Sequence, residues 1–432
     1  MKLRRVRARD WDWRRTPSSD PLARAAVEEM VAAVRQEGER AVRRLTAEHD
    51  CRPEALAPAW SFAVPRERLQ AAWEALPETL REALRAAADR IRRFHEAQKP
   101  QDVELAGTDG ERLGMVWRPV PRVGVYAPGG RAAYPSSVLM NLIPAQVAGV
   151  PELVLVSPPS GPDGFPHPLV LAAAYLAGVT QVYRVGGAQA IAALAYGAGE
   201  IPKVDKVVGP GNLYVALAKR VVMGDVGIDS IAGPSEVFVV ADETANPAWV
   251  AADLLAQAEH DAEAGAVLVT TAPGLADAVE AELARQLADL PRRELAAKAL
   301  ADWGAVVLAE RWEEAVAVVN RSAPEHVELH VAEPRRWLAA IDCAGAVFLG
   351  PYTPEPVGDY YAGPNHILPT HGSARYASGL SVYDFLRRIT YAEYTAETLV
   401  RHTGHVTALA RAEGLEAHAR AVEIRRQGGG AR

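Results

Sequence analysis

Short β-branched runs alternate with alanine-rich helical segments from about residue 115 to about residue 350. Each run ends near glycine or proline, and the runs are VGVYAPGG, ELVLVSPP, QVYRVGGAQ, KVVGPGN, EVFVVAD, AVLVTTAP, AVVLAE and GAVFLG. Strand, turn and helix in repeated order predict βαβ units and mostly parallel sheets. Because there are more strands than one modest sheet holds, we expect an α/β protein with two Rossmann-like lobes.

The segments on either side of this region do not show the repeated strand–turn–helix pattern. Residues 1–20 are expected to form a short basic arm, and residues 381–432 a helical C-terminal segment. Between them we expect residues 126–235 to form one α/β lobe. That lobe is inserted into another, discontinuous lobe, which is built from residues 21–125 and 236–380.

Composition narrows the functional class. The chain has 432 residues and a net charge of −7, which argues against a nucleic-acid or anionic-membrane binder, because such proteins need a basic face. The longest mostly apolar stretch, residues 169–179, falls short of the ~18 residues that a membrane span needs. Cys51 and Cys343 lie far apart and make no disulfide framework, which fits a reducing compartment. We therefore expect a cytoplasmic protein that binds neither nucleic acid nor membranes.

Three glycine-rich loops follow predicted strands, at residues 126–130, 185–189 and 209–212. Open parallel sheets bind ligands outside the carboxyl ends of their strands, so each loop could bring backbone N–H groups close to a phosphate. None of them is a GxGxxG fingerprint, because Tyr214 stands where the last loop would need its third glycine. Tight turns without a ligand are the alternative, and a nucleotide bound here must be held in an unusual way.

The segment LLAQAEHDAEAG carries a candidate pair of metal ligands. Gln257 and His260 are spaced i, i+3, so on a helix they share one face. The ring nitrogen of His260 and the amide oxygen of Gln257 could then bind the same ion. A helix end with solvated charges is the alternative for this segment.

The turn SAPEHVE carries a candidate pair of proton-transfer groups. Pro324 fixes its own φ and favours an extended Ala323, which presents Glu325 and His326 on a set backbone. A carboxylate beside an imidazole supplies two groups that move protons near neutral pH. Adjacent Glu-His pairs also occur by chance on surfaces.

Two further segments lie nearer the C-terminus. Residues 351–371 hold five prolines and two glycines, which predict an ordered loop rather than a helix or strand. Irregular backbone that carries Asp359, Tyr360 and two histidines favours a binding role. Together with His418, which lies in a helical segment, the residues above offer nitrogen and oxygen ligands suited to Zn²⁺, although Mn²⁺ or Co²⁺ also fits.

From the residues alone, two classes of enzyme stay open. A scattered His and Asp set with a Glu-His pair suits a zinc hydrolase of small amides or amines as well as an oxidoreductase. A two-domain solute-binding protein is a third possibility, because paired α/β lobes are common there. The clustering of proton-transfer residues weighs against it.

Six segments resemble histidinol dehydrogenase in their order and spacing: GPGNLYVALAKR, DSIAGPSEVFVVAD, LLAQAEHD, NRSAPEHVELHV, TPEPVGDYYAGPNHILPT and EGLEAHARAV. The resemblance runs over essentially the whole chain. It implies an NAD- and Zn²⁺-dependent enzyme that oxidises L-histidinol through L-histidinal to L-histidine. It also implies a homodimer with shared active sites, in which the segment from Glu413 to His418 reaches the partner's site.

The resemblance also implies roles for individual residues. It makes Glu325 and His326 the acid–base pair. The implied metal ligands are Gln257, His260, Asp359 and His418, and these four residues and His326 also contact the substrate. The implied additional substrate contacts are Ser136, Ser235, Tyr360, His366 and Glu413, and the implied NAD contacts are Tyr126, Gln189 and Asn212.

A mechanism follows as a hypothesis. The metal orients the substrate, His326 takes the hydroxyl proton, and Glu325 activates a water that adds to the aldehyde. His326 then deprotonates the hydrated aldehyde for the second hydride transfer. This route needs no thiol, so we expect Cys51 and Cys343 to take no part in it.

Overall fold

The computed structural model describes residues 2–13, 20–129, 133–161 and 163–427. The chain divides into two compact units, each held together by its own internal contacts. Each unit is described by itself. Unit 1 comprises residues 1–98 and 120–385, and unit 2 comprises residues 99–119 and 386–432. In the described part of the chain, no helix is long and apolar enough to cross a membrane.

Unit 1 contains a six-stranded sheet in which every neighbouring pair of strands is parallel. In spatial order the strands are β1 (Arg4–Arg7), β11 (Ala305–Leu308), β10 (Gly265–Thr270), β9 (Glu236–Ala241), β12 (His326–His330) and β13 (Ala346–Leu349). The chain proceeds from β9 toward β11 in one direction and then from β12 to β13 in the other. The order of the strands therefore reverses between β9 and β12.

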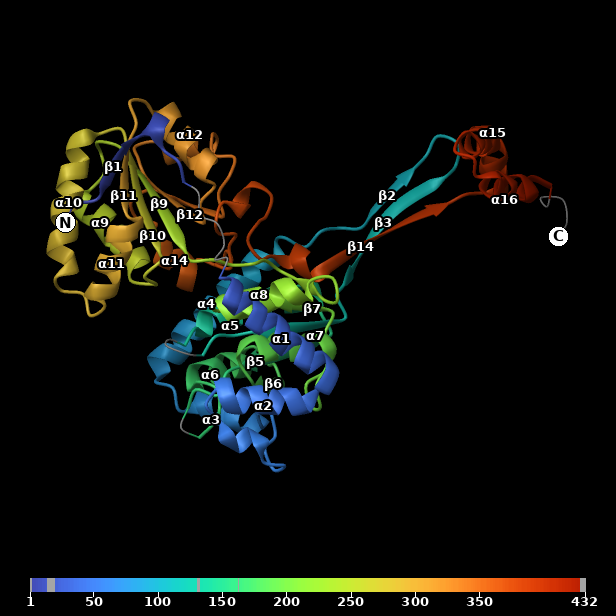
Figure 1. The fold of residues 1–432 in the computed structure, drawn as a ribbon. Helices are drawn as coiled ribbons and strands as arrows, with labels where there is room; N and C mark the ends of the chain where they lie inside the picture. The colour runs from blue at the N-terminus through green and yellow to red at the C-terminus, as the bar shows by residue number, and fades with distance from the viewer. Residues whose placement is uncertain (1, 14–19, 130–132, 162, 428–432) are drawn as a thin grey trace. The chain divides into compact units, whose positions relative to one another are not determined.

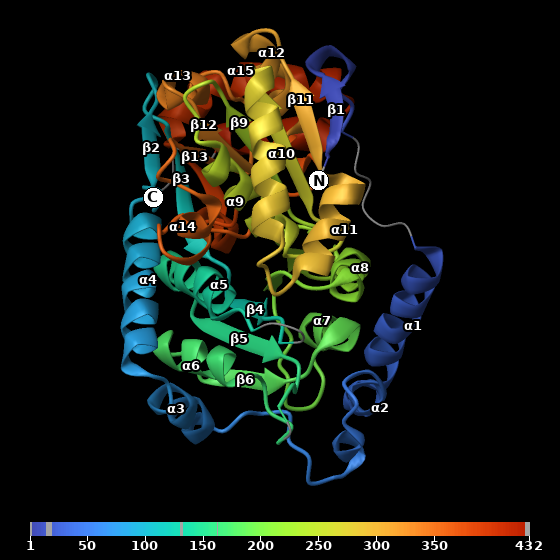
Figure 2. The ribbon, with the colours of Figure 1, turned by 90° about the vertical axis from the view of Figure 1, so that its left-hand side faces the viewer.

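Helices cover both faces of this sheet (Figures 1 and 2). The helices of one face are α9 (Pro247–Ala258), α10 (Pro273–Leu287) and α11 (Arg293–Trp303). The elements of the other face are η1 (Ala8–Asp10), α12 (Trp312–Ser322) and α13 (Pro334–Leu338). Because β9 and β10 are buried on both faces, their sequences read as continuous apolar runs rather than as alternating ones.

Unit 1 also contains a second, five-stranded parallel sheet. Its strands in spatial order are β6 (Gln181–Arg184), β5 (Glu152–Ser157), β4 (Arg122–Tyr126), β7 (Lys206–Val208) and β8 (Gly227–Ile228). The helices around it are α1 (Pro21–Glu37), α2 (Glu39–His49), α3 (Arg66–Glu74), α4 (Glu78–Glu96), α5 (Pro135–Ala148), α6 (Pro168–Leu176), α7 (Gly187–Tyr196) and α8 (Leu213–Val222). The strand order reverses between β4 and β7. Two parallel α/β sheets confirm the predicted fold class.

The packing of the helices groups the segments of the chain differently from the two lobes that we predicted. We expected residues 21–125 to belong with residues 236–380, but α1 and α2 share one hydrophobic core with α7 and α8. The apolar stripe of α1, formed by Val27, Val31 and Val34, is fully buried in that core, and this burial decides where the helix packs. The predicted basic arm supplies β1 to the six-stranded sheet, while its residues 14–19 lie outside the described residues.

Unit 2 is small and built around an antiparallel three-stranded sheet. Its elements are β2 (Val103–Ala106), β3 (Arg112–Pro119), β14 (Leu386–Glu393), α15 (Ala396–Ala412) and α16 (Glu416–Gln427). The predicted helical segment over residues 381–432 is confirmed for α15 and α16, but it is wrong for residues 386–393, because β14 pairs with β3 along eight residues. The remaining short elements of the chain are η2 (Pro53–Leu56), η3 (Ser373–Arg375), η4 (Val382–Phe385) and α14 (Glu355–Tyr360).

Candidate active site

Three titratable side chains alternate along one face of β12. His326, Glu328 and His330 each lie beside a β9 residue whose side chain faces α9, and all three are buried. Since successive side chains of a strand point to opposite faces, these three share one face, and the apolar Val327 and Leu329 point to the other. A central strand of this sheet thus presents a polar column to one layer of helices.

The helices α9 and α14 add carboxylates and an amide to this column. Asp253 and Gln257 are four residues apart on α9, and Glu355 and Asp359 are four residues apart on α14, so each pair shares a helix face. Asp253 Oδ2 lies 2.9 Å from His330 Nε2, and Glu355 Oε1 lies 3.7 Å from His326 Nδ1. Both helices therefore line the polar face of β12.

At one end of the column is a group suited to a metal ion. One ligand atom each from His260, Glu355 and Asp359 lies within 4.8 Å of the others. Gln257 is fully buried in the last turn of α9, and its backbone carbonyl accepts a hydrogen bond from His260 N at 3.2 Å. Both polar atoms of its amide have no hydrogen-bond partner among the described residues. A buried amide without partners is costly, which indicates a ligand for it.

His326 is held as a neutral imidazole with one nitrogen available. Its Nδ1 lies 3.2 Å from the carbonyl oxygen of Glu236. A carbonyl oxygen only accepts, so Nδ1 carries the proton and Nε2 the lone pair. Nε2 has no hydrogen-bond partner among the described residues, and burial lowers the pKa of the ring to about 4. The ring is thus placed to accept a proton at Nε2.

Glu325 lies beside His326 with its carboxyl group buried. Its Oε2 accepts a hydrogen bond from Glu236 N at 3.1 Å, and the hydroxyl of Ser235 donates to the same carboxyl group. Burial outweighs these hydrogen bonds and raises the pKa of Glu325 well above its usual value. A carboxylate with a raised pKa is a stronger base, as general base catalysis of water addition requires.

Two local expectations were wrong. Ala323 is left-handed, with φ 47° and ψ 59°, rather than extended, because it caps α12 through a hydrogen bond from its N–H to Val319 O. The residues that carry Asp359 form a short helix, α14, rather than a loop. Proline is tolerated in a first helical turn, where its missing N–H would have no helical partner, so Pro356 does not prevent the helix. The chain after α14 is irregular, as predicted.

The predicted substrate contacts of unit 1 lie around the same site. His366 Nδ1 is 2.8 Å from the carbonyl of Asp359, and its Nε2 is 3.1 Å from the hydroxyl of Ser137. Ser136, the predicted contact, neighbours that serine in the first turn of α5 and is partly exposed. Tyr360 is 57% exposed, so its ring is free to contact a ligand.

The three glycine-rich loops follow the carboxyl ends of β4, β6 and β7, as expected, although Gly130 lies outside the described residues. The loops after β4 and β7 flank the reversal in strand order, which is where open α/β sheets bind ligands. Gly209, with φ 110°, approaches so closely that a Cβ there would lie 2.2 Å from the carbonyl of Tyr126. Asn212 is exposed at the start of α8, where its Oδ1 accepts a hydrogen bond from Val215 N.

The predicted NAD contacts Tyr126 and Gln189 are buried and hold the loop after β6. The Tyr126 hydroxyl accepts a hydrogen bond from Gly187 N at 3.3 Å. Asp50, which the sequence did not single out, accepts hydrogen bonds on Oδ2 from Gly186 N at 3.3 Å and from Gln189 Nε2 at 3.2 Å. A carboxylate of the chain itself therefore sits where a phosphate-binding helix start would receive a phosphate.

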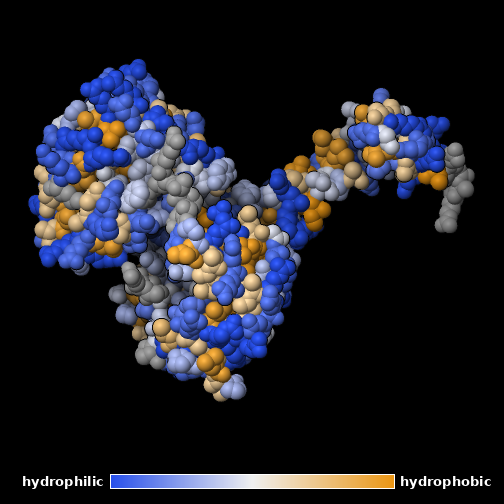
Figure 3. All heavy atoms as spheres, viewed as in Figure 1, coloured by the Kyte–Doolittle hydropathy of each residue, from blue (hydrophilic) through white to orange (hydrophobic). Residues whose placement is uncertain are grey.

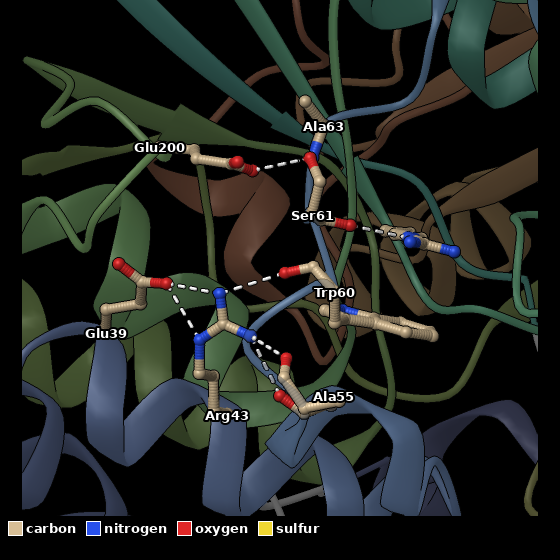
Figure 4. A network of polar contacts seen from close by, with 9 residues as sticks. Glu39, Arg43, Ala55, Trp60, Ser61, Ala63 and Glu200 are labelled. Atoms are coloured by element: carbon tan, nitrogen blue, oxygen red, sulfur yellow. Dashed lines mark hydrogen bonds and ion pairs between the residues drawn. The ribbon is translucent and has the colours of Figure 1, made fainter.

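The segment after Asp50 is fixed by Arg43 on α2 (Figure 4). Its guanidinium donates to the carbonyl oxygens of Ala55 and Trp60 at 3.0 and 2.9 Å and to Glu39 Oε1 at 2.8 Å. Several acceptors around one planar group hold this connection against α2. The connection leads from Asp50 toward β6 and its loop, because Val64 N donates to the carbonyl of Val182 in β6.

Glu413 and His418 belong to unit 2. Glu413 ends α15 and His418 lies in the first turns of α16, and both are exposed. The candidate metal group of His260, Glu355 and Asp359 contains residues of unit 1 alone. A role for Glu413 and His418 at that group stays a prediction.

Comparison with known sequences identifies the family. A sequence model of histidinol dehydrogenase matches residues 14–426. The chain belongs to the histidinol dehydrogenase family. It is 52% identical to the histidinol dehydrogenase of Moorella thermoacetica over 403 residues, which are 93% of this chain and 94% of that protein. It is 50% identical to that of Geobacillus kaustophilus over 99% of this chain and all of that protein.

A solved structure agrees. The crystal structure of histidinol dehydrogenase from Elizabethkingia anophelis matches with a TM-score of 0.93 at 35% identity, over 99% of each chain. Membership of the family makes the chain an oxidoreductase, which confirms the enzyme class expected from the motifs.

Sequence reasoning missed four residues of the polar column: Asp253, Glu328, His330 and Glu355. For Glu328 and His330 the signal is present in the sequence as HVELH, which alternates polar and apolar positions with a period of two. We had interpreted this segment as a turn because it follows Ser-Ala-Pro.

Proposed function

We propose that this chain oxidises L-histidinol through L-histidinal to L-histidine, with reduction of two NAD⁺ and with Zn²⁺ held at the active site. The observation that carries the proposal is the unpartnered, fully buried amide of Gln257 beside the group formed by His260, Glu355 and Asp359. Membership of the histidinol dehydrogenase family supports the choice of substrate.

The donor set of unit 1 fits a divalent ion. Gln257, His260 and Asp359 would hold it, with one amide oxygen, one imidazole nitrogen and one carboxylate oxygen. Glu355 is a further candidate ligand, since its carboxylate belongs to the same group. When bound, the ion supplies Lewis-acid polarisation and orients the imidazole and amine of histidinol.

His326 transfers the proton of the substrate hydroxyl. Because Nδ1 donates to the carbonyl of Glu236, Nε2 receives the proton in both oxidation steps. The low pKa of the buried ring keeps it neutral, and therefore able to accept, throughout the physiological pH range. NAD⁺, when bound, would supply the hydride acceptor for both steps.

Glu325 removes a proton from the water that adds to the aldehyde. Ser235 and Glu236 N fix the orientation of its carboxyl group. No thiol is needed for this step. Cys51 is exposed and lies near Asp50, and Cys343 lies on the chain that leads into β13.

NAD would bind at the reversal of strand order in the five-stranded sheet. Asn212 is exposed there, at the start of α8, and Gly209 closely approaches Tyr126 O between the two loops. Tyr126 and Gln189, together with Asp50, hold the loop after the neighbouring edge strand β6. Asp50 accepts the hydrogen bond of Gly186 N at the start of α7, so that helix start is not available to a pyrophosphate.

The proposal includes a homodimer with shared sites. Unit 2 exposes many apolar side chains over its strands and helices (Figure 3), among them Val103, Leu105, Leu409 and Ile424 at 54 to 68% exposure. A three-stranded sheet whose apolar side chains are this exposed needs another protein surface to bury them. A second copy of the chain would supply that surface, and His418 and Glu413 would then serve the partner's site. A cytoplasmic location stays a prediction from the cysteine usage.

Stoichiometry tests the reaction directly. Metal-loaded protein incubated with limiting L-histidinol and excess NAD⁺ should form two NADH per histidinol, measured at 340 nm. The zinc hydrolase alternative uses the same ligands but forms no NADH, so a product without NADH would overturn the proposal.

Mixed subunits test the shared site. His260→Ala and His418→Ala subunits, each inactive alone, are mixed and allowed to reassociate. If the C-terminal segment crosses over, one site of each mixed dimer is wholly wild-type and activity returns. If every mixed dimer stays inactive, the site is built within one chain.

A further inference from the structure

Beside the proposed metal group lies a second polar group that the reaction does not use. It consists of Asp253, Glu328 and His330, whose ligand-type atoms all lie within 4.8 Å of one another. The side chains of Glu328 and His330 are 1% and 2% exposed. Three titratable groups at this depth in a parallel sheet are costly, because apolar residues would stabilise the core instead.

Glu328 makes a specific contact with the helix that carries Asp359. Its Oε1 accepts a hydrogen bond from the backbone N–H of Glu355 at 2.5 Å. Glu355 is the first residue of α14, so this N–H is one of those that a helix leaves without a partner. The N-cap residue of α14 is Pro354, which supplies no side-chain cap. A carboxylate from β12 therefore caps α14 from outside the helix.

The rest of the group holds Glu328 in place. A carboxylate oxygen of Asp253 lies within 4.8 Å of one of Glu328, and Asp253 Oδ2 lies 2.9 Å from His330 Nε2. Asp253 comes from α9, the helix that also carries Gln257. One group thus ties α9, β12 and α14 together, at a level one helical turn away from the proposed ligands Gln257 and Asp359.

We propose that Glu328 is a positioning residue for the metal site: it fixes the start of α14, and through it the places of Glu355 and Asp359. The length of α14 supports this role. A helix of six residues has few internal hydrogen bonds and is not stable by itself, so its place depends on the contacts at its ends. The inference rests on the proposed function for the metal and goes beyond it in assigning Glu328.

Two substitutions and one matched control test the role. Glu328→Ala removes the acceptor, whereas Glu328→Gln keeps an oxygen for Glu355 N–H and offers an amide N–H to Asp253. Glu280→Ala is the control, because Glu280 is another buried glutamate of unit 1 that accepts a backbone hydrogen bond, from Leu3 N at 3.0 Å. It lies on α10, outside the polar column.

The first readout is the binding of Zn²⁺ by purified protein, measured by competition with a chromophoric chelator. Glu328→Ala should weaken Zn²⁺ binding about tenfold or more, while Glu328→Gln and Glu280→Ala stay within about threefold of wild type. A Glu328→Ala protein that binds Zn²⁺ as tightly as wild type would refute the role of Glu328 and leave the metal site intact. A wild-type protein that binds no Zn²⁺ would refute the metal site itself.

The second readout needs no metal. Amide hydrogen exchange of a peptide covering α14, in metal-free protein, should be about tenfold faster in Glu328→Ala than in wild type or Glu328→Gln. Glu280→Ala should leave this peptide unchanged even if it destabilises the protein. Equal exchange in Glu328→Ala and wild type, or equal acceleration by Glu280→Ala, would overturn the inference.

Discussion

Asp50 offers a quantitative test of how the loop after β6 is held. The carboxylate at the end of α2 is partly buried, and burial raises its pKa from an ordinary 3.8 to about 6, although two hydrogen bonds oppose the shift. The folded protein therefore prefers the protonated carboxyl group. Below pH 3.8 the carboxyl group is protonated in both the folded and the unfolded state, and the folded state keeps its full stability. As the pH rises from 3.8 through about 6, the unfolded state ionises first and the folded state loses stability.

The size of the effect follows from the two pKa values. Ionising a carboxyl group whose pKa rises from 3.8 to about 6 on folding lowers the free energy of unfolding by about 3 kcal/mol. Roughly 2 kcal/mol of this loss falls between pH 4.5 and pH 7.5. Asp50→Asn removes the ionisation and keeps both hydrogen bonds, because Gly186 N and Gln189 Nε2 donate to the same oxygen.

The assay is urea unfolding of wild type and Asp50→Asn at pH 4.5 and pH 7.5. The free energy of unfolding of the variant, relative to wild type, should increase by about 2 kcal/mol between the two pH values. Asp50→Ala serves as the matched variant. It should show the same pH dependence but be less stable than Asp50→Asn by about 1–2 kcal/mol at both pH values, because both hydrogen bonds are lost. A difference between Asp50→Asn and wild type that does not change with pH would refute the reasoning.

Three further variants test separate parts of the account. Glu325→Gln should slow the oxidation of histidinal at least about tenfold more than the oxidation of histidinol, and equal damage to both half-reactions, measured with each substrate, would contradict its role toward water. Replacing Cys51 and Cys343 by Ala together should leave NADH formation from histidinol within about twofold of wild type, whereas selective loss of the aldehyde step would point to a thiol route. Gly209→Ala should cost about 2 kcal/mol or more in unfolding free energy and raise KM for NAD, because the new Cβ meets a carbonyl oxygen at 2.2 Å. An unchanged KM in that variant would remove this loop from the proposed NAD site.

The strands of the two α/β sheets could be predicted from sequence because most of them are buried on both faces. All eight predicted runs contain strands, of three to six residues, since short apolar runs rich in β-branched residues are typical of a parallel sheet. β12 is also buried on both faces, but its sequence is not an apolar run. Three of its five residues, His326, Glu328 and His330, are polar and form the polar column, so the strand was missed.

The backbone around the proposed catalytic pair, Glu325 and His326, shows where local rules are overridden. A residue before proline is expected to be extended, yet Ala323 is left-handed because α12 must end there. Residues 354–360 appeared too rich in proline for a helix, yet α14 forms, because its prolines lie at its start and Glu328 accepts its first N–H. Both corrections depend on contacts between segments that are distant in sequence.

The position of the site within the six-stranded sheet could not be read from fold rules. Open α/β sheets bind ligands at the carboxyl ends of their strands, and the glycine-rich loops of the five-stranded sheet follow that rule. In the six-stranded sheet, Ser235, Glu325 and His326 lie at the amino ends of β9 and β12. The motifs alone pointed to these residues, and no pattern in the strands would have done so.

The central claim is that Gln257, His260 and Asp359 hold a divalent ion on which the oxidation depends. The most direct test measures metal content together with histidinol-dependent NADH formation in the same sample, before chelation, after chelation and after Zn²⁺ is restored. The account predicts about one ion per subunit at the start, loss of NADH formation with the ion, and recovery of both on reloading. Undiminished NADH formation by protein that is free of metal would contradict it.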